Sequence, residues 1–322
     1  MSAALRIGIM GCADIATRRM LPAIAAEPGV VPAAVASRDH GRAVDVAARH
    51  GCAAVGGYAA LLERSDVDAV HVPLPIALHA PWVERALLAG KHVLAEKPLT
   101  TDAARTAELA ALARSRGLVL MENVMFLHHS MHRRVRELID GGAVGEPRTF
   151  AASFAIPPPP AGDIRYRPDL GGGALLDIGL YPLRAAQLLL GPRLDVVGAD
   201  LREDPRHGVD TEGAVLLRTP EGVTAQLTFG MRHAYRNTYE LWGSEGGLRV
   251  ERAFTPPAGL RPVVHHERQG ERRQLSLDAD DQCRNTVRAF AAAVRGDGPG
   301  SGIEGTVALA ELLDAVRERA RG

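Results

Sequence analysis

Lysine is scarce in this chain: of the 38 lysine and arginine residues among its 322, only Lys91 and Lys97 are lysines. Arginine keeps its positive charge at any ordinary pH, whereas a lysine can have its pKa moved and can release a proton. A movable proton is therefore one reason to keep a lysine. Lys91 is expected to be an ordinary exposed lysine. Lys97 follows a short apolar strand and precedes Pro98, and it is the better candidate for proton chemistry.

Cysteine, unbalanced charge and long apolar runs are also lacking. Cys12, Cys52 and Cys283 are too few and too scattered for a disulfide framework or a CxxC metal site, which favours a reducing, cytoplasmic environment. The formal net charge is zero, so no nucleic acid or anionic membrane is expected as a partner. No apolar run has the length of a transmembrane helix or the form of a secretory signal. We expect the partner to be a small molecule.

Up to residue 122 the chain alternates short apolar strands with helical segments. Strands are expected at 5–10, 30–36, 67–72, 93–95 and 118–121, and helices at about 15–24, 44–47, 81–89 and 101–116. Repeated units of this kind predict a parallel sheet, because parallel neighbours need crossover helices.

From residue 123 the pattern changes. Helices are expected at 130–139, 174–190, 283–294 and 307–316, and alternating apolar and polar residues at 194–275 are typical of an antiparallel sheet. Single cores seldom grow beyond roughly 250 residues, so two domains are expected, 1–122 and 123–322. The predicted fold class is α/β: an N-terminal Rossmann doubly wound parallel sheet, then a C-terminal α+β domain with a large open, mostly antiparallel sheet.

The turn after the first strand has the position of a dinucleotide-binding G-x-G-x-x-G motif. It reads Gly11-Cys12-Ala13-Asp14-Ile15-Ala16, with alanine in place of the second and third glycines. Alanine is an accepted variant at the third position, whereas Ala13 narrows the gap where a pyrophosphate must approach. The turn opens a helix whose amides and dipole favour an anion. We expect Gly11, Cys12, Ala13, Asp14 and Ile15 to contact a dinucleotide.

The end of the second strand indicates which dinucleotide is bound. An acidic residue there would accept hydrogen bonds from a ribose 2′-hydroxyl, but this chain has Ser37 and Arg38, a hydroxyl and a planar cation. Arg42, one helical turn on, could assist with a 2′-phosphate. Asp39 could be a ribose ligand, but it is also suited to be the N-cap of the following helix. NADP is therefore favoured over NAD.

A second group of residues could move a proton. Gly171 to Gly173 allow a loop to enter a helix closely, and Asp177 and Tyr181 then lie four residues apart on one helical face. Lys97 as an ammonium would lower the pKa of a nearby phenol, and a carboxylate would keep the lysine charged or orient the substrate. Alone, the pair would more often be a surface aspartate and a packed tyrosine.

Together these segments resemble the Gfo/Idh/MocA oxidoreductases. The motifs that carry the resemblance are the Gly8 to Ala16 turn, Ser37-Arg38, Val70 to Pro75 with His79, Ala89 to Pro98 (AGKHVLAEKP) and Gly171 to Tyr181 (GGGALLDIGLY), in the family's order and spacing. The resemblance implies a Rossmann domain that carries NAD(P), a C-terminal sheet domain that binds substrate and covers the nicotinamide, and a homodimer or homotetramer formed through that sheet. It also implies Lys97 and Asp177 as catalytic residues.

The chain departs from the family pattern at two positions. Tyr181 stands where many members have histidine, and Ile76 stands where an asparagine usually follows the proline. The tyrosine, with the segments 121–126 (MENVMF) and 163–166 (DIRY), is similar to the branch of nucleotide-sugar C-3 ketoreductases. By that likeness Arg165 would lie near the nicotinamide. A neutral phenol can donate a proton to a developing alkoxide, so ketone reduction is chemically reasonable.

We therefore predict an NADPH-dependent reductase of a keto group, at C-3, on a nucleotide-linked deoxysugar in deoxysugar biosynthesis. Whether Tyr181 or Lys97 gives the proton stays open. One alternative is a dehydrogenase of a free sugar, cyclitol or dihydrodiol; another, of a different class, is a non-catalytic NAD(P)-binding regulator. The predicted catalytic residues are Lys97, Tyr181 and Asp177; the further predicted cofactor contacts are Pro73, Leu74, His79, Glu96, Lys97 and Arg165; the predicted substrate contacts are Lys97, Asn123, His128, Asp177, Tyr181 and Arg232.

A metal site is not expected. His128 and His132 have the i and i+4 spacing of metal ligands on a helix, but no carboxylate motif accompanies them, and the family that the chain resembles transfers hydride without a metal. A contact of His128 or His129 with a sugar or nucleotide is favoured over a metal site, and a plain surface pair of histidines is favoured over both.

Overall fold

The computed structural model describes residues 3–298 and 300–322, and the chain divides into two compact units. The first unit contains Met1–Met125 and Cys283–Val307, and the second contains Phe126–Gln282 and Ala308–Gly322. The division after Met125 lies close to the expected boundary at residue 123. Residues 283–307 group with the first unit, whereas the sequence pattern predicts that they belong to the second domain.

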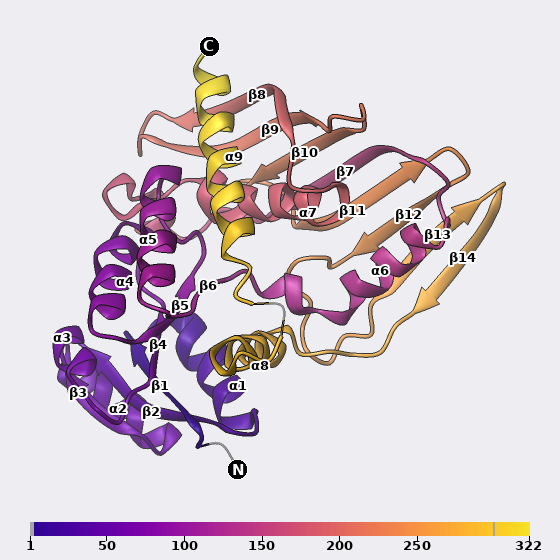
Figure 1. Cartoon of the computed structure of the whole chain (residues 1–322). Coiled ribbons are helices and arrows are strands. Elements are labelled where there is room, and N and C mark those ends of the chain that lie inside the picture. The colour runs from indigo at the N-terminus through magenta and orange to yellow at the C-terminus, as the bar shows by residue number, and fades with distance from the viewer. Residues whose placement is uncertain (1–2, 299) are drawn as a thin grey trace. The chain divides into compact units, whose positions relative to one another are not determined.

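The first unit is built on a six-stranded parallel sheet with the order β3-β2-β1-β4-β5-β6 (Figure 1). The neighbours of β1 are β2 and β4, so the strand order reverses there, and ligands bind in such sheets at the carboxyl ends of the strands beside the reversal. The expected strands are present; β3 and the short helix after it were not predicted, because Ala53-Ala54-Val55 has one strongly apolar residue. The strands are β1 (Leu5–Met10), β2 (Val30–Ser37), β3 (Ala53–Gly56), β4 (Ala69–Val72), β5 (His92–Glu96) and β6 (Leu120–Asn123).

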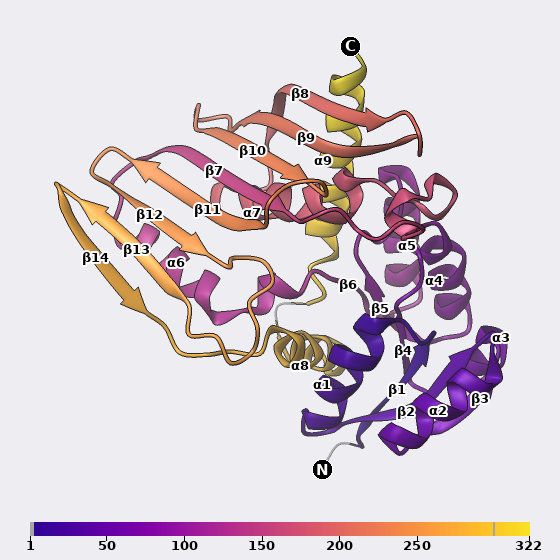
Figure 2. The same cartoon turned by 180° about the vertical axis from the view of Figure 1, so that it is seen from behind.

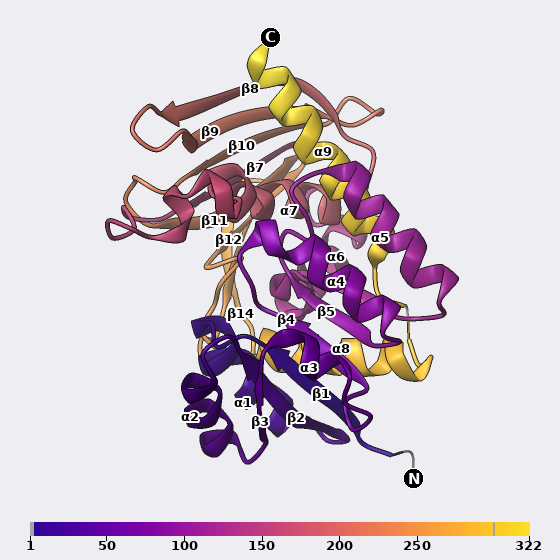
Figure 3. The same cartoon turned by 90° about the vertical axis from the view of Figure 1, so that its left-hand side faces the viewer.

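Helices cover both faces of this sheet. On one face α3 (Tyr58–Leu62), α4 (His79–Leu88) and α5 (Ala103–Ser115) share an apolar core with the strands, and α4 and α5 lie side by side (Figure 3). The other core includes α1 (Leu21–Ala26), α2 (His40–His50) and α8 (Gln282–Arg295).

Helix α8 joins the first unit through both apolar and charged contacts. Val287 and Phe290 are fully buried in the second of these cores. Glu27, itself 8% exposed, accepts hydrogen bonds from Arg284 Nε at 2.9 Å and Arg288 Nε at 3.0 Å. Sequence periodicity identified this helix as amphipathic but could not show which sheet its apolar face would cover, because that partner lies more than 250 residues away.

The second unit contains an eight-stranded sheet with the order β14-β13-β12-β11-β7-β10-β9-β8 (Figure 2). The neighbours are antiparallel except for β7 and β10, which run parallel. The predicted α/β fold class, with its mostly antiparallel second sheet, is confirmed. The strands are β7 (Pro147–Ala155), β8 (Asp195–Asp204), β9 (Val209–Arg218), β10 (Thr224–Gly230), β11 (Arg236–Gly243), β12 (Gly246–Glu251), β13 (Val263–Arg268) and β14 (Glu271–Ser276).

Alternation along these strands produces one apolar and one polar face. In β9 and β11 every second residue is buried, as expected for a sheet with one covered side. Four aromatic residues of the second unit are among the largest fully buried side chains: Phe150, Phe229, Tyr239 and Phe254. The helices of this part of the chain are α6 (Ser130–Asp140), α7 (Leu180–Leu190), which contacts β7 and β10, and α9 (Ile303–Arg321), which enters the second unit at Ala308.

None of the helices formed by residues 3–298 and 300–322 is both long and apolar enough to cross a membrane.

Candidate active site

A cavity of about 560 Å³ lies in the first unit at the carboxyl ends of β1, β2 and β4. Eight of the residues predicted to bind the cofactor line it, namely Gly11, Cys12, Ala13, Ser37, Arg38, Arg42, Pro73 and Leu74. Asp39, Tyr58 and Pro75 complete the lining. Tyr58 was missed because it belongs to the short helix that the sequence pattern did not predict.

The chain turns sharply at Gly11, directly after β1. Gly11 has a φ of +119°, and its amide donates to Ala36 O at 2.8 Å on the neighbouring strand. The chain then enters a π-helical turn (Ala16–Met20) that continues into α1. Asp14 and Ile15 do not line the cavity: Asp14 is exposed beside Arg18, and Ile15 packs against the apolar core. The predicted contacts from these two side chains thus have no support in the cavity lining.

The end of β2 presents a cationic rim to the cavity. Asp39 Oδ1 accepts a hydrogen bond from Arg42 N at 3.3 Å, so Asp39 is the N-cap of α2, one of the two roles that its position suggested. Arg42 Nη2 donates to Cys12 O at 3.4 Å, which holds this guanidinium over the glycine turn. Arg38 is exposed. Arg38, Arg42 and the Ser37 hydroxyl thus provide the groups that would bind a 2′-phosphate.

Buried polar side chains lie where β4, β5 and β6 end. Asn123 Nδ2 donates to Glu96 Oε1 at 2.6 Å, and His71 Nε2 lies 3.7 Å from the same oxygen. Burial raises the pKa of Glu96 to about 7, against the opposing effects of Asn123 and Lys97, and burial lowers the pKa of His71 to about 4. Asn123, a predicted substrate contact, is 1% exposed and donates to Glu96 within this cluster.

The two lysines have different environments. Lys97 is half-buried directly after β5, at the carboxyl edge of the sheet. The expectation of an exposed Lys91 is wrong: the residue is 9% exposed, and its Nζ donates to Arg64 O and Val67 O, each at 2.7 Å. Burial lowers the pKa of Lys91, and Asp68 opposes the shift. The role of Lys91 is structural, because its ammonium group donates to two backbone carbonyls.

His79 was predicted to contact the cofactor, but it does not line the cavity. It is 0% exposed, with Nδ1 2.8 Å from Pro98 O and Nε2 2.7 Å from Leu74 O. Both ring nitrogens therefore face backbone carbonyls.

In the second unit, Asp177 and Tyr181 lie where a glycine loop enters a helix. A π-helical turn (Leu175–Gly179) carries Asp177, and α7 begins directly after it, whereas a single regular helix was expected over 174–190. Gly173 has a φ of +119°, and a Cβ on it would collide with Asp210 Oδ1. Asp210 accepts a hydrogen bond from Leu175 N at 2.6 Å, so it anchors the start of this helix.

Arg165 pairs with the aspartate that the sequence marked as catalytic. Its Nε lies 2.5 Å from Asp177 Oδ2, and its Nη1 lies 3.1 Å from Asp163 Oδ1. Burial lowers the pKa of Arg165, but the two carboxylates outweigh it, and the net pKa is raised. Asp177 thus faces a permanent cation within its own unit.

Tyr181 is 7% exposed and has aromatic neighbours. Its ring meets Phe154 edge-on at a centroid distance of 5.0 Å, and Phe254 and Phe126 lie at 5.8 and 6.0 Å. Such packing fixes the direction of the phenol. Of the three predicted catalytic residues, Asp177 and Tyr181 belong to the second unit, and Lys97 belongs to the first.

The remaining candidates have mainly structural surroundings. His132 has Nδ1 2.9 Å from the Tyr239 hydroxyl and Nε2 2.9 Å from Ala253 O, and burial lowers its pKa to about 3. His128 is partly buried, and burial lowers its pKa to about 4. Arg232, a predicted substrate contact, forms an ion pair with Asp204 at 3.0 Å. Within residues 3–298 and 300–322, no three histidine, cysteine or acidic side chains are grouped as metal ligands would be.

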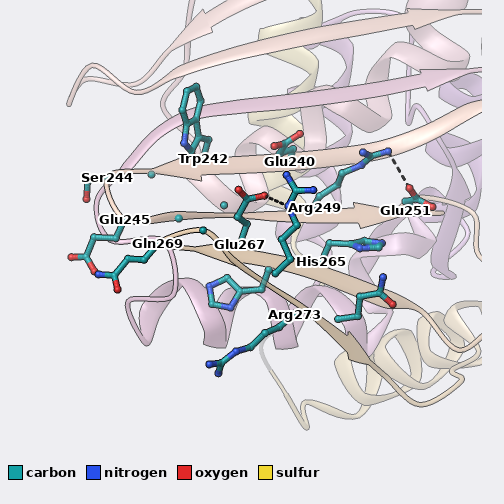
Figure 4. Close-up of a pocket in the computed structure, with 17 residues that line it drawn as sticks. Glu240, Trp242, Ser244, Glu245, Arg249, Glu251, His265, Glu267, Gln269 and Arg273 are labelled. Atoms are coloured by element: carbon teal, nitrogen blue, oxygen red, sulfur yellow. Dashed lines mark hydrogen bonds and ion pairs between the residues drawn. The ribbon is translucent and has the colours of Figure 1, made fainter.

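A second cavity, of about 980 Å³, lies over strands β11 to β14 and their turns (Figure 4). Charged side chains dominate its lining, and several are paired, among them Arg249 with Glu251 at 3.0 Å and Arg272 with Glu267 at 2.9 Å. Trp242 stands at its rim and is 65% exposed, the largest exposed apolar side chain of the described residues.

Two family models match the chain. Residues 5–124 match an oxidoreductase family model described as an NAD-binding Rossmann fold, and residues 132–249 match the GFO/IDH/MocA C-terminal domain.

Similar proteins extend over nearly the whole chain. The chain is 59% identical to a dTDP-3,4-didehydro-2,6-dideoxy-alpha-D-glucose 3-reductase of Streptomyces violaceoruber, over 98% of this chain and 96% of that protein. It is 36% identical to a D-xylose 1-dehydrogenase (NADP(+)) of Haloferax volcanii, over 98% and 97%. A crystal structure of KijD10, a 3-ketoreductase from Actinomadura kijaniata in complex with NADP and TDP-benzene, matches with a TM-score of 0.96 and 57% identity over 98% of each chain.

Proposed function

The chain belongs to the Gfo/Idh/MocA family of oxidoreductases, and we propose that it reduces the C-3 ketone of a dTDP-linked 2,6-dideoxysugar with NADPH. The match at 59% identity to a 3-reductase of such a sugar covers both units, so it includes the substrate-binding half of the chain. The predicted activity and cofactor agree with this assignment.

One observation carries the cofactor assignment. Ser37, Arg38 and Arg42 line the same cavity as the Gly11 turn, and the acidic residue beside them, Asp39, is engaged as a helix cap. The residues present therefore fit a dinucleotide with a 2′-phosphate: the turn amides would face the pyrophosphate, and the two arginines would face the extra phosphate. NADPH supplies the hydride that adds to the ketone carbon.

Side chains of the protein have to supply the proton that the C-3 oxygen takes up. We propose that Tyr181 or Lys97 donates it to the developing C-3 alkoxide and that Asp177 orients the sugar. Packing of Tyr181 against Phe154 holds its phenol in one direction, and Arg165 keeps Asp177 beside a cation. Lys97, which directly follows β5 at the carboxyl edge of the first sheet, would hold the oxygen that gains charge.

We also propose that the reductase is a homodimer or homotetramer that associates through the second sheet. Exposed Trp242 on the polar face of β11 supports this, because large aromatic side chains are enriched where proteins associate. Sedimentation of the wild type and of Trp242→Glu should give a smaller species for the variant. A monomeric wild type would refute the proposal.

The activity is tested by giving the purified protein NADPH and dTDP-3,4-didehydro-2,6-dideoxyglucose and following the loss of NADPH absorbance. Arg38→Ala should raise the KM for NADPH and leave the KM for NADH nearly unchanged, because only the former carries the phosphate. Oxidation of free sugars or cyclitols with NAD, together with no turnover of the keto-sugar nucleotide, would overturn the assignment.

A further inference from the structure

His79 lies between two segments of the first unit that have different tasks. Its Nε2 faces the carbonyl of Leu74, in the segment Pro73 to Pro75 that lines the cofactor cavity. Its Nδ1 faces the carbonyl of Pro98, the residue directly after Lys97. The ring is 0% exposed.

The backbone around His79 keeps the ring in this position. A 3-10 turn (Ile76–Leu78) leads into α4, and His79 is the first residue of that helix. Its amide donates to Ile76 O. The backbone position of His79 is therefore fixed. One nitrogen of its imidazole contacts the cofactor segment, and the other contacts the turn that follows Lys97.

A buried carbonyl that loses its donor costs free energy, so each contact restrains the segment that it touches. Burial lowers the pKa of His79, with the charge of Lys97 acting in the same direction and the carbonyl oxygens opposing both. A doubly protonated imidazole donates to both carbonyls, whereas a neutral one carries a single N–H and donates to one of them at a time. Each ring nitrogen faces a different carbonyl, so the two contacts are separable by substitution.

We propose that His79 is a positioning residue that couples the cofactor segment Pro73–Pro75 to the Lys97–Pro98 turn, so that a bound dinucleotide and the lysine are held in register. The inference rests on the proposed reductase activity. Displacement of a catalytic group by about 1 Å can cost a factor of about 100 in rate, so a contact one residue from Lys97 is well placed to affect turnover.

Two substitutions separate the contacts. Asparagine places an amide nitrogen near the position of Nδ1, and glutamine places one near Nε2, so His79→Asn keeps the donor toward Pro98 O and His79→Gln keeps the donor toward Leu74 O. For His79→Asn we expect a raised Kd and KM for NADPH with kcat largely kept. For His79→Gln we expect the Kd for NADPH to be kept and kcat to fall about ten- to a hundredfold. His79→Phe, which keeps an aromatic ring and loses both ring nitrogens, should show both defects.

His92→Phe is the matched control. His92 also hydrogen-bonds the backbone, accepting from Val119 N at 3.0 Å, but it begins β5, whereas Lys97 follows the end of that strand. Its loss should lower the melting temperature without changing kcat or the Kd for NADPH. This separates the loss of a histidine that hydrogen-bonds the backbone from the loss of the coupling.

The outcomes are distinct. Equal effects of the asparagine and glutamine variants on kcat and on the Kd for NADPH, or a change in melting temperature alone, would overturn the coupling. If the wild type itself fails to reduce the keto sugar, the proposed function fails. Fluorescence titration with NADPH still tests His79→Asn in that case, and an unchanged Kd for NADPH in this variant would overturn the inference independently.

Discussion

Arg165 Nε lies 2.5 Å from Asp177 Oδ2, and both residues belong to the second unit. The guanidinium also contacts Asp163, so one arginine pairs with two carboxylates at the entrance to the helix of Tyr181. Charge-assisted pairs of this kind are stronger and more directional than neutral hydrogen bonds. The orientation of Asp177 therefore depends on a side chain twelve residues earlier.

Arg165→Met should lower kcat/KM for the keto sugar about ten- to a hundredfold, because a hydrogen bond to a charged group contributes roughly 1.5–3 kcal/mol. Arg165→Lys should recover part of the loss, since it keeps the charge but not the geometry. Steady-state kinetics check this. Arg167→Met is the matched control, because Arg167 forms a similar but exposed pair with Asp169, and it should stay within about twofold of the wild type. Equal losses in the methionine variants at 165 and 167 would contradict the role of the Asp177 pair.

The two lysines should give opposite results when each is replaced by methionine. Lys97→Met should abolish measurable turnover and leave the Kd for NADPH and the melting temperature nearly unchanged. Lys91→Met should retain turnover and lower the melting temperature, because it removes the donor from the buried Val67 carbonyl and from the partly buried Arg64 carbonyl, at a cost of about 1–3 kcal/mol. Kinetics and thermal unfolding of the same two preparations check the contrast. Turnover in Lys97→Met near the wild-type level would remove Lys97 from the chemistry.

The cofactor half was predictable to a large extent because its signals are local. The Gly11 turn, Ser37-Arg38 and the apolar strands are short contiguous patterns, and the structure brings eight of their predicted contacts into one cavity. Residues whose role depends on distant partners were not predictable. Lys91 appeared to be a surface residue, because nothing near it in sequence reveals Arg64 O and Val67 O as acceptors.

The same limit applies to His79 and to α8. The family resemblance placed His79 at the cofactor, but Pro98 O, one of its two acceptors, lies 19 residues away in sequence, and only the folded sheet brings the two together. Likewise α8 displays an apolar face, but its position on the first unit depends on Glu27 and on core residues from the start of the chain. Patterns of 2 and 3.6 residues indicate that a face is buried, not what covers it.

Tyr181→Phe should distinguish the two candidates for the proton donor. If the phenol donates, kcat should fall by about two to four orders of magnitude, the usual contribution of a positioned general acid. If Lys97 donates, kcat should fall only modestly, and the pH profile of kcat should keep its shape. Phenylalanine keeps the packing with Phe154, so a normal melting temperature is the control. The wild-type profile, measured in the same buffers, is the reference for both outcomes.

Glu96 gives a prediction about stability and pH. Burial raises its pKa to about 7 from an ordinary value of 4.5, so between these values the folded protein binds more protons at this site than the unfolded chain does. This carboxyl group must therefore make the fold less stable as the pH rises through that window, and the penalty is complete above pH 7. Glu96→Gln removes the titration and keeps an acceptor oxygen for Asn123 Nδ2.

We expect the melting temperature of Glu96→Gln, relative to the wild type, to rise between about pH 5 and about pH 8. The difference between the two proteins is the quantity to measure, because other groups titrate equally in both. Glu63→Gln, at an exposed residue that directly follows α3 and lies outside this cluster, is the control. A Glu96→Gln difference that does not change with pH would mean that this carboxyl group is already ionised throughout the range, and Asn123 and Lys97 would then dominate its environment over burial.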